Sequence, residues 1–350
     1  MTRVLVTGAG GYVGTVLVPE LLAAGHAVRA LDRFFFGADL LAPHPRLELV
    51  RADTRLLEPR HLDGADAVVD LAALSNDPSG ERFAAATWAI NHAARVRCAR
   101  LAAAAGVARY VLPSSCSVYG FRPDDAPCDE DSAPNPLTTY AAANLKAEAD
   151  ILPLASDTFC VTVLRQATLY GASPRMRFDL AVNGMTWGAW STGVLPLMRD
   201  GTQWRPLMHV RDAASAIRFV LEQPPERVNA RILNAGPRDG NVRLADLAAR
   251  VAAALPRPVR TEWYGDPDAR SYRVAFDRIA ELGWRARHGV EAAVAEIAAL
   301  LDAGRLERSP RTITLDWYDA LERRHGALSD PRAGFDQGAF RGGPAVSDVG

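Results

Sequence analysis

A glycine-rich segment near the N-terminus constrains this chain most strongly. Residues 4–7 are apolar and predict a short strand, residues 12–24 predict a helix, and Gly8, Gly11 and Gly14 fall at the junction. The first glycine suits a tight turn, the second lets backbone N–H groups approach a pyrophosphate, and the third allows close packing of helix against strand. A glycine motif in this strand–turn–helix setting predicts a dinucleotide site.

Short apolar segments alternate with longer amphipathic ones over the first two thirds of the chain. Further strands are predicted at 27–31, 47–50, 67–71, 110–113 and 160–164, with helices at 81–105 and 140–152. Thr138 and Thr139 can cap the second of these helices. This order predicts an α/β fold with a Rossmann-type, doubly wound parallel sheet.

The pattern loosens after residue 170 and predicts a smaller C-terminal substrate-binding lobe. Strands are expected near residues 194 and 232, and helices at 210–221, 244–255, 290–303 and 312–324. We therefore expect a dinucleotide-binding domain over 1–170 and a lobe over 171–329 that is partly interleaved with it. Residues 330–350 are rich in Gly, Pro and Ser, and we expect them to be disordered.

Composition excludes several classes of function. The 350 residues carry a net charge of −1, so no overall field attracts nucleic acid or an anionic membrane. No apolar run approaches the ~20 residues of a membrane-spanning helix. The four cysteines, at positions 98, 116, 128 and 160, match no C-x-x-C or zinc spacing. We expect a cytoplasmic protein with reduced thiols, no metal, and neither nucleic acid nor membrane as a partner.

Two carboxylates follow predicted strands and suit the adenosine half of a dinucleotide. Asp32 lies 18 residues beyond Gly14, where it can accept hydrogen bonds from ribose hydroxyls and repel a 2′-phosphate. It favours NAD over NADP, and the neighbouring Arg33 weakens that preference slightly. Asp53 could reach the adenine amino group. Either acid could instead be an ordinary solvated loop residue.

A second pair of motifs gives the chain a recognisable family. Ser-Ser-Cys-Ser-Val-Tyr-Gly at 114–120 follows the predicted fifth strand, and Tyr140-Ala-Ala-Ala-Asn144 begins a helix about twenty residues later. With the glycine loop, these segments resemble the extended short-chain dehydrogenase/reductase family, specifically its NAD-dependent sugar epimerases and dehydratases. Further matches occur in order at 164–165, 170–171, 209–210, 234–236 and 282–284.

The resemblance implies NAD as cofactor and assigns roles to individual residues. Ser115 and Tyr140 match the Ser/Thr and Tyr that handle the proton of a sugar hydroxyl. The implied NAD contacts are Gly8, Gly11, Tyr12, Val13, Gly14, Asp32, Arg33, Asp53, Thr54, Leu71, Ala72, Ala73, Tyr140 and Asn144.

Two departures from the family pattern bear on the chemistry. The family has Lys four residues after the Tyr, where this chain has Asn144, and the lost charge is worth about 1–3 pKa units at the Tyr. Either the chemistry demands less of the base, another cation compensates, the site is weakened, or the residue has been substituted. The family's 4,6-dehydratases have Asp-Glu where this chain has Cys116 and Ser117, which argues against dehydration and favours 4-epimerase-like members.

The resemblance also implies a nucleotide-diphosphate sugar as substrate. Asn183, Arg205 and Arg270 fall where relatives contact the diphosphate, and arginine suits phosphate because its planar fork binds bidentately. The remaining implied substrate contacts are Ser75, Asn76, Ser115, Ser117 and Thr168. Family members often dimerise through helices matching 81–105 and 140–152, so the resemblance is compatible with a homodimer, although the sequence does not decide the oligomeric state.

We expect an NAD-dependent epimerase of a nucleotide-activated sugar, acting at C4 through a transient 4-keto intermediate. A nucleotide-sugar 4-ketoreductase would use the same residues. A non-catalytic NAD-binding protein is the alternative from a different class, suggested by the missing Lys.

Overall fold

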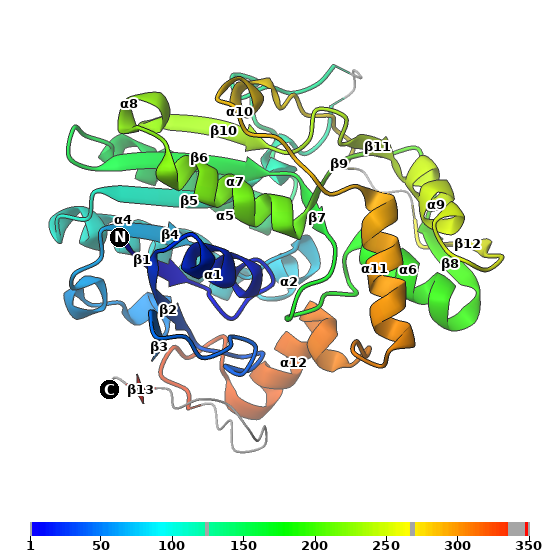
Figure 1. Ribbon diagram of the computed structural model, residues 1–350, viewed down its shortest axis with the longest axis horizontal. Helices are drawn as coiled ribbons and strands as arrows, with labels where there is room; N and C mark the ends of the chain where they lie inside the picture. Colours follow the sequence, from blue (N-terminus) through cyan, green and yellow to red (C-terminus); the bar gives the residue numbers. More distant parts are fainter. Residues whose placement is uncertain (1, 123–125, 267–269, 335–346, 349–350) are drawn as a thin grey trace.

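A parallel β-sheet forms the centre of the molecule (Figure 1). The computed structural model describes residues 2–122, 126–266, 270–334 and 347–348. Seven strands run in the order β10-β6-β5-β4-β1-β2-β3, and the two-residue β13 pairs with β3 at the edge. All pairings in this sheet are parallel, which confirms the α/β, doubly wound fold. The strands are β1 (Arg3–Thr7), β2 (Ala27–Asp32), β3 (Leu47–Arg51), β4 (Ala67–Asp70), β5 (Arg109–Ser115), β6 (Cys160–Gln166), β10 (Arg231–Ala235) and β13 (Ser347–Asp348).

Helices cover both faces of the sheet because strand side chains alternate between them. Val4 and Val6 face a core that includes α1 and α7, whereas Leu5 faces a core that includes α4 and α5. In Figure 1, α1 and α7 lie in front of the sheet. The principal helices here are α1 (Gly14–Ala23), α4 (Arg95–Ala104), α5 (Thr139–Ile151) and α7 (Val210–Glu222). Thr138 caps α5 as expected, its hydroxyl accepting a hydrogen bond from the Ala141 N–H at 3.2 Å.

The prediction of a single helix over 81–105 is wrong. The segment instead contains α2 (Asp77–Arg82), α3 (Ala84–Thr87), a π-helical turn η3 (Trp88–Ala94) and then α4. Phe83, between α2 and α3, has φ −122° and ψ 50°, which are not helical. Asn76 starts α2 early by accepting a hydrogen bond from the Ser79 N–H at 2.8 Å. Alanine-rich composition favours helix but does not reveal such breaks.

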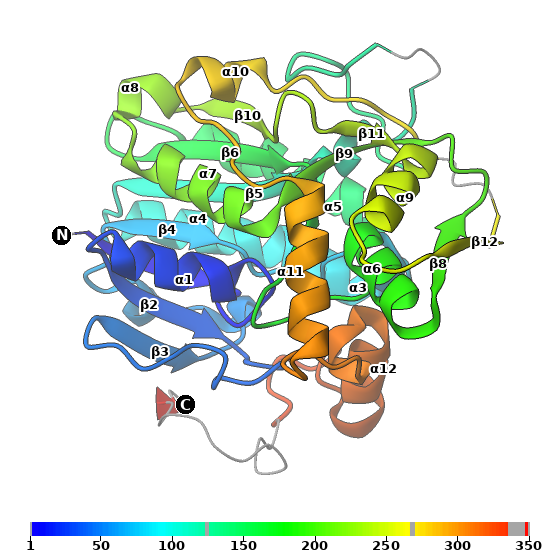
Figure 2. The same cartoon turned by 45° about the vertical axis from the view of Figure 1, so that its right-hand side comes forward.

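A smaller lobe lies beyond the carboxyl ends of the strands (Figure 2). Its apolar core is contributed by α6, β8, α9 and α11, among others. Its elements are β7 (Thr168–Tyr170), α6 (Ala181–Thr192), β8 (Val194–Met198), β9 (Trp204–His209), β11 (Asn241–Arg243), α9 (Leu244–Ala253), β12 (Arg260–Tyr264) and α11 (Val290–Asp302). The later elements α7 and β10 return to the large sheet, so the chain passes between the two parts more than once.

Helix α6 was not expected because Gly184 and Gly188 lie within it, and glycine disfavours helix. A Cβ at Gly184 would lie 2.7 Å from the Phe178 carbonyl oxygen, and one at Gly188 would lie 2.7 Å from Pro196 Cδ. Close packing against neighbouring segments therefore requires both glycines.

The segment after α12 (Thr314–His325) lies beside the outer strands of the sheet. Residues 326–334 run back toward β2 and β3. The disorder expected for 330–350 concerns mainly residues outside the described ranges, whereas 330–334 are placed and contact Arg33. The remaining short helices are η1 (Thr54–Leu56), η2 (Pro59–Leu62), η4 (Cys116–Tyr119), η5 (Leu152–Leu154), α8 (Pro225–Val228), α10 (Asp277–Glu281) and η6 (Pro310–Thr312). Within the described residues, no helix has the length and apolarity needed to cross a membrane.

Candidate active site

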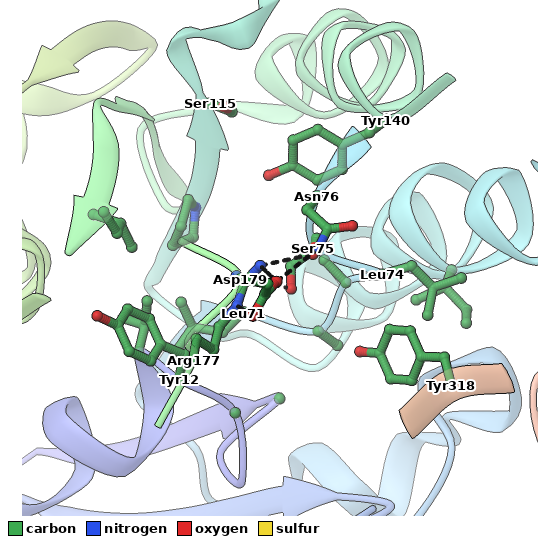
Figure 3. Close-up of a pocket in the computed structure, with 18 of the residues that line it drawn as sticks. Tyr12, Leu71, Leu74, Ser75, Asn76, Ser115, Tyr140, Arg177, Asp179 and Tyr318 are labelled. Atoms are coloured by element: carbon green, nitrogen blue, oxygen red, sulfur yellow. Dashed lines mark hydrogen bonds and ion pairs between the residues drawn. The ribbon is translucent and has the colours of Figure 1, made fainter. Parts of the chain in front are cut away.

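A cavity of about 640 Å³ opens where the strands of the large sheet meet the smaller lobe. Residues after β1, β2, β4 and β5 form one side of it, and Met198, Arg205 and Arg270 from the smaller lobe contribute to the other. Parallel α/β sheets bind ligands at this edge because loops from adjacent strands converge there. Figure 3 shows the interior, with Tyr140 and Tyr318 projecting toward it from different helices.

The glycine loop has the geometry that its spacing predicts. Gly8 has φ +66°, and a Cβ there would lie 2.7 Å from the Ala72 backbone nitrogen. A Cβ at Gly14 would lie 2.5 Å from the Ala9 carbonyl oxygen. No side chain caps the start of α1, and although the Thr15 and Val16 N–H groups donate to the Gly11 and Val13 carbonyls, the positive end of the helix dipole remains available to an anion. Since Gly8, Gly11 and Gly14 all line the cavity, this end fits a dinucleotide pyrophosphate.

Asp32 lies at the end of β2 with its carboxylate on the cavity wall. It accepts hydrogen bonds from the Gly10 N–H at 3.0 Å and the Phe34 N–H at 2.6 Å. Burial raises the pKa of this carboxyl to about 6, although both backbone bonds oppose the shift. Additional donors, such as ribose hydroxyls, would therefore find a carboxylate that still needs hydrogen bonds in its ionised form.

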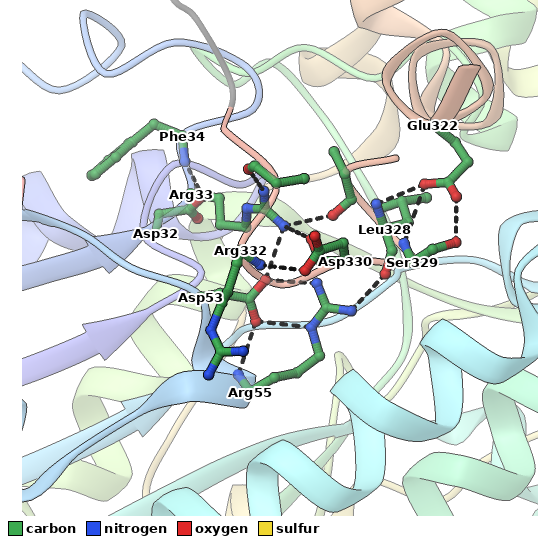
Figure 4. A network of polar contacts seen from close by, with 12 residues as sticks. Asp32, Arg33, Phe34, Asp53, Arg55, Glu322, Leu328, Ser329, Asp330 and Arg332 are labelled. Carbon is green, nitrogen blue, oxygen red and sulfur yellow. Dashed lines mark hydrogen bonds and ion pairs between the residues drawn. The ribbon is translucent and has the colours of Figure 1, made fainter. Parts of the chain in front are cut away.

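Arg33 and Asp53 belong to a polar cluster with the C-terminal segment (Figure 4). Arg33 Nη1 is 3.0 Å from Asp53 Oδ2, and its Nη2 donates to the Ala333 carbonyl at 2.7 Å. Arg55 also pairs with Asp53 at 2.7 Å and donates to the Leu328 carbonyl at 2.5 Å. The two arginines thus engage the Asp53 carboxylate that we expected at the adenine, although Asp53 still lines the cavity.

Ser115 and Tyr140 line the same cavity and come from different elements, β5 and α5. Ser115 ends β5, and its hydroxyl accepts a hydrogen bond from the Ser117 N–H at 3.1 Å. Tyr140 lies in the first turn of α5. Burial raises the pKa of the Tyr140 phenol above its usual value, and Arg95 and, to a smaller extent, Ser115 act in the opposite direction. A Cβ at Gly80 would lie 2.9 Å from Tyr140 Cβ, so α2 needs glycine to pack here.

Asn144 lies one turn beyond Tyr140 but is not among the residues that line the cavity. Its side-chain oxygen accepts a hydrogen bond from Arg95 Nη1 at 2.7 Å, and its amide donates to the Tyr140 carbonyl at 2.9 Å. Arg95 does line the cavity. Sequence reasoning missed Arg95, because an arginine in an alanine-rich helix gives no sign of whether it is solvated or buried.

Most of the expected substrate contacts share the same cavity. Ser75, Asn76, Ser117, Thr168, Arg205 and Arg270 all line it. Arg270 pairs with Asp77, and Arg205 donates to the backbone carbonyl of Arg270. These contacts hold the two arginines on one wall.

Asn183 is the exception, since the structure places it away from the cavity lining. Its side chain is fully buried, with Oδ1 accepting from the Gly171 N–H at 2.8 Å and Nδ2 donating to the Arg177 carbonyl at 2.9 Å. In this arrangement Asn183 holds the loop that follows β7, a role that differs from the phosphate contact expected for it.

The loop that Asn183 holds carries three charged residues into the cavity. Arg177 pairs with Asp179 at 2.6 Å, and Arg175 lies 3.7 Å from the centre of the Phe36 ring. Burial would raise the pKa of Asp179, but Arg177, together with Arg175 and Thr314, outweighs it and holds the pKa at about 2. Tyr318 of α12, which sequence reasoning also missed, completes this end of the cavity (Figure 3).

Known proteins similar in sequence to this chain include UDP-sugar 4-epimerases. Residues 4–236 match the NAD dependent epimerase/dehydratase family. The UDP-glucose 4-epimerase of Corynebacterium glutamicum is 28% identical over 319 residues, covering 82% of this chain and 91% of that protein. The UDP-arabinose 4-epimerase 1 of Arabidopsis thaliana is 26% identical over 330 residues, covering 82% of this chain and 76% of that protein.

Solved structures extend the similarity to three dimensions. MoeE5 in complex with UDP-glucose and NAD superposes with a TM-score of 0.75 at 28% identity, covering 86% of this chain and 99% of that one. DesIV, a dTDP-glucose 4,6-dehydratase from Streptomyces venezuelae with NAD bound, gives 0.76 at 26% identity, covering 87% and 98%. The chain therefore belongs to the NAD-dependent epimerase/dehydratase family of enzymes, and its cofactor is NAD.

Proposed function

We propose that this enzyme is a 4-epimerase of a nucleoside-diphosphate sugar, working through a transient 4-keto sugar. The observation that carries the proposal is which groups in the cavity can accept or donate a proton. Ser115 and Tyr140 both line the cavity, whereas Cys116 is buried and its thiol donates to the Arg165 carbonyl at 3.2 Å. Burial raises the pKa of that thiol well above its usual value, so it is no substitute for a carboxylic acid. Positions 116 and 117 therefore supply no carboxylic acid for the elimination of water. Inversion at one carbon needs hydride exchange with NAD and proton transfer by the Ser–Tyr pair.

The chain's residues divide the chemical work. Bound NAD supplies the hydride acceptor and donor. Tyr140, as a phenolate, takes the proton of the sugar hydroxyl while the carbon is oxidised, and returns it when the carbonyl is reduced on its other face. Ser115 hydrogen-bonds the same oxygen and holds it near Tyr140. No net proton or electron is lost over the cycle.

Residues of the smaller lobe bind the nucleotide half of the substrate. Arg205 and Arg270 line the cavity and suit a diphosphate by charge and by their planar donor arrays. The curated relatives named above are UDP-sugar 4-epimerases, and MoeE5 was solved with UDP-glucose, which supports a UDP-sugar as substrate. Remote binding of this kind lets the sugar ring turn while the diphosphate stays fixed.

The test offers the purified protein UDP-glucose, UDP-glucuronic acid and dTDP-glucose with NAD, and follows the sugars by NMR. The proposal predicts a C4 epimer from at least one of them with no net change in NADH. Tyr140→Phe is the matched control and should give none. Net consumption of NADH with a 4-keto sugar would identify a ketoreductase instead. Binding of NAD without turnover of any sugar would contradict an epimerase.

A further inference from the structure

A buried arginine lies close to Tyr140 without a carboxylate of its own. Arg95 begins α4, is 3% exposed and lines the cavity. Its Nε donates to the Ala72 carbonyl at 3.1 Å and its Nη1 to Asn144 Oδ1 at 2.7 Å. Both acceptors are neutral. Over residues 2–122, 126–266 and 270–334, no ion pair is recorded for Arg95.

Two other buried arginines, Arg165 and Arg177, are paired with carboxylates, whereas the buried Arg175 bonds the Thr314 hydroxyl. Arg165 lies 2.7 Å from a Glu148 oxygen, and Arg177 lies 2.6 Å from Asp179. Taking a charge out of water costs several kcal/mol unless a partner compensates. A buried guanidinium without a carboxylate partner therefore costs free energy of folding. A negative charge that forms beside it during the reaction would offset that cost.

Asn144 holds the guanidinium in place. Its Nδ2 donates to the Tyr140 carbonyl one turn earlier at 2.9 Å, which leaves its Oδ1 as the acceptor for Arg95. Because Asn144 is 1% exposed and lies off the cavity lining, its amide serves the protein interior. Two neutral acceptors, Asn144 on α5 and Ala72 after β4, thus hold Arg95 in place. Asn144 in turn bonds the Tyr140 backbone, which links Arg95 to Tyr140.

The charged groups acting on the Tyr140 phenol come from three directions. Arg95 on α4 has the largest effect among them and favours the ionised form, and Arg177 acts in the same sense from the loop after β7. Asp77 on α2 opposes ionisation, although it is paired with Arg270. Burial still dominates and raises the pKa. Removing Arg95 would leave burial and Asp77 opposed only by the smaller effects of Ser115 and Arg177.

We propose that Arg95 and Asn144 together take the place of the lysine expected at position 144: Arg95 supplies the positive charge for deprotonated Tyr140, and Asn144 holds Arg95. Both are positioning residues that act through Tyr140, whose part as proton acceptor rests on the proposed function. A lysine at 144 would put an ammonium where Arg95 now finds an acceptor. Two combinations of residues would therefore place one positive charge near Tyr140. One is arginine at 95 with asparagine at 144, and the other is lysine at 144 with a neutral residue at 95.

The test titrates Tyr140 in the protein without cofactor or substrate. Tyrosinate absorbance of each variant is compared with that of the same variant carrying Tyr140→Phe, so the difference reports Tyr140 alone. Arg95→Met should raise the titration midpoint by about 1–3 pH units, the usual effect of losing a nearby opposite charge. Arg95→Lys, which keeps the charge, should move it less. Arg100→Met removes an exposed charge from the same helix and should leave it unchanged.

The double variant Arg95→Met/Asn144→Lys gives the sharpest result. It should bring the midpoint back toward the native value, whereas Asn144→Lys alone should lower the melting temperature by placing two cations together. A purely structural Arg95 predicts no return of the midpoint in the double variant, and that result would overturn the proposal. Should Arg95→Met fail to fold, Arg95→Lys and the double variant still decide. Because the titration needs no sugar, it stands or fails separately from epimerase activity.

Discussion

Protonation of Asp32 should control NAD binding in the mildly acidic range. The folded, ligand-free protein holds the pKa of this carboxyl at about 6, chiefly because of burial, whereas the unfolded chain has the ordinary value of 3.8. Ribose hydroxyls donate to the ionised form, so binding requires the proton to leave. At about pH 5 only about a tenth of the molecules are ionised, and the affinity should be about tenfold weaker than at about pH 8.

Calorimetry of NAD binding from about pH 5 to about pH 8 measures this dependence, and Asp32→Asn is the control. The variant should bind weakly with little pH dependence. The same pKa has a consequence for stability: between about pH 4 and 6 the folded state holds more protons than the unfolded chain, so stability without NAD should fall as pH rises through that window. An NAD affinity that is constant from pH 5 to 8, or an equal slope in Asp32→Asn, would refute the argument.

Three further outcomes follow from the site. NAD should bind at least about tenfold more tightly than NADP in calorimetry, because Asp32 repels a 2′-phosphate and Arg33 is engaged by Asp53; equal affinities would remove Asp32 from this role. Tyr140→Phe should abolish turnover and leave NAD affinity nearly unchanged, and a fully active variant would rule out Tyr140 as the base. Arg270→Ala should raise KM far more than it lowers kcat, the mark of ground-state binding, and an unchanged KM would separate Arg270 from the substrate.

The large sheet could be predicted because its signals are local. Buried parallel strands are short apolar runs, and the six predicted in the first two thirds agree with the structure within about two residues at each end. The helices after residue 205 were also recognisable from their periodicity. In contrast, α6 depends on Gly184 and Gly188 fitting against neighbouring segments, and that is a tertiary property. The break at Phe83 was hidden by the alanines around it.

The site followed the same division. Motif residues such as Gly8, Asp32 and Ser115 line the cavity because the motif and the strand ends coincide. Asn183 was expected at the phosphates, yet its polar atoms are bonded within the protein, which spacing alone could not reveal. Arg95 was overlooked because its importance comes from burial beside a residue 49 positions away in sequence.

Transfer of deuterium tests the proposed epimerisation most directly. A UDP-sugar carrying deuterium at C4 is incubated with the enzyme and NAD, and the sugars are analysed by NMR and mass spectrometry. Oxidation and reduction at one carbon within a closed site predict a C4 epimer that keeps its deuterium at C4, with none released to water. Loss of the label to solvent, or an epimer formed at another carbon, would contradict the account.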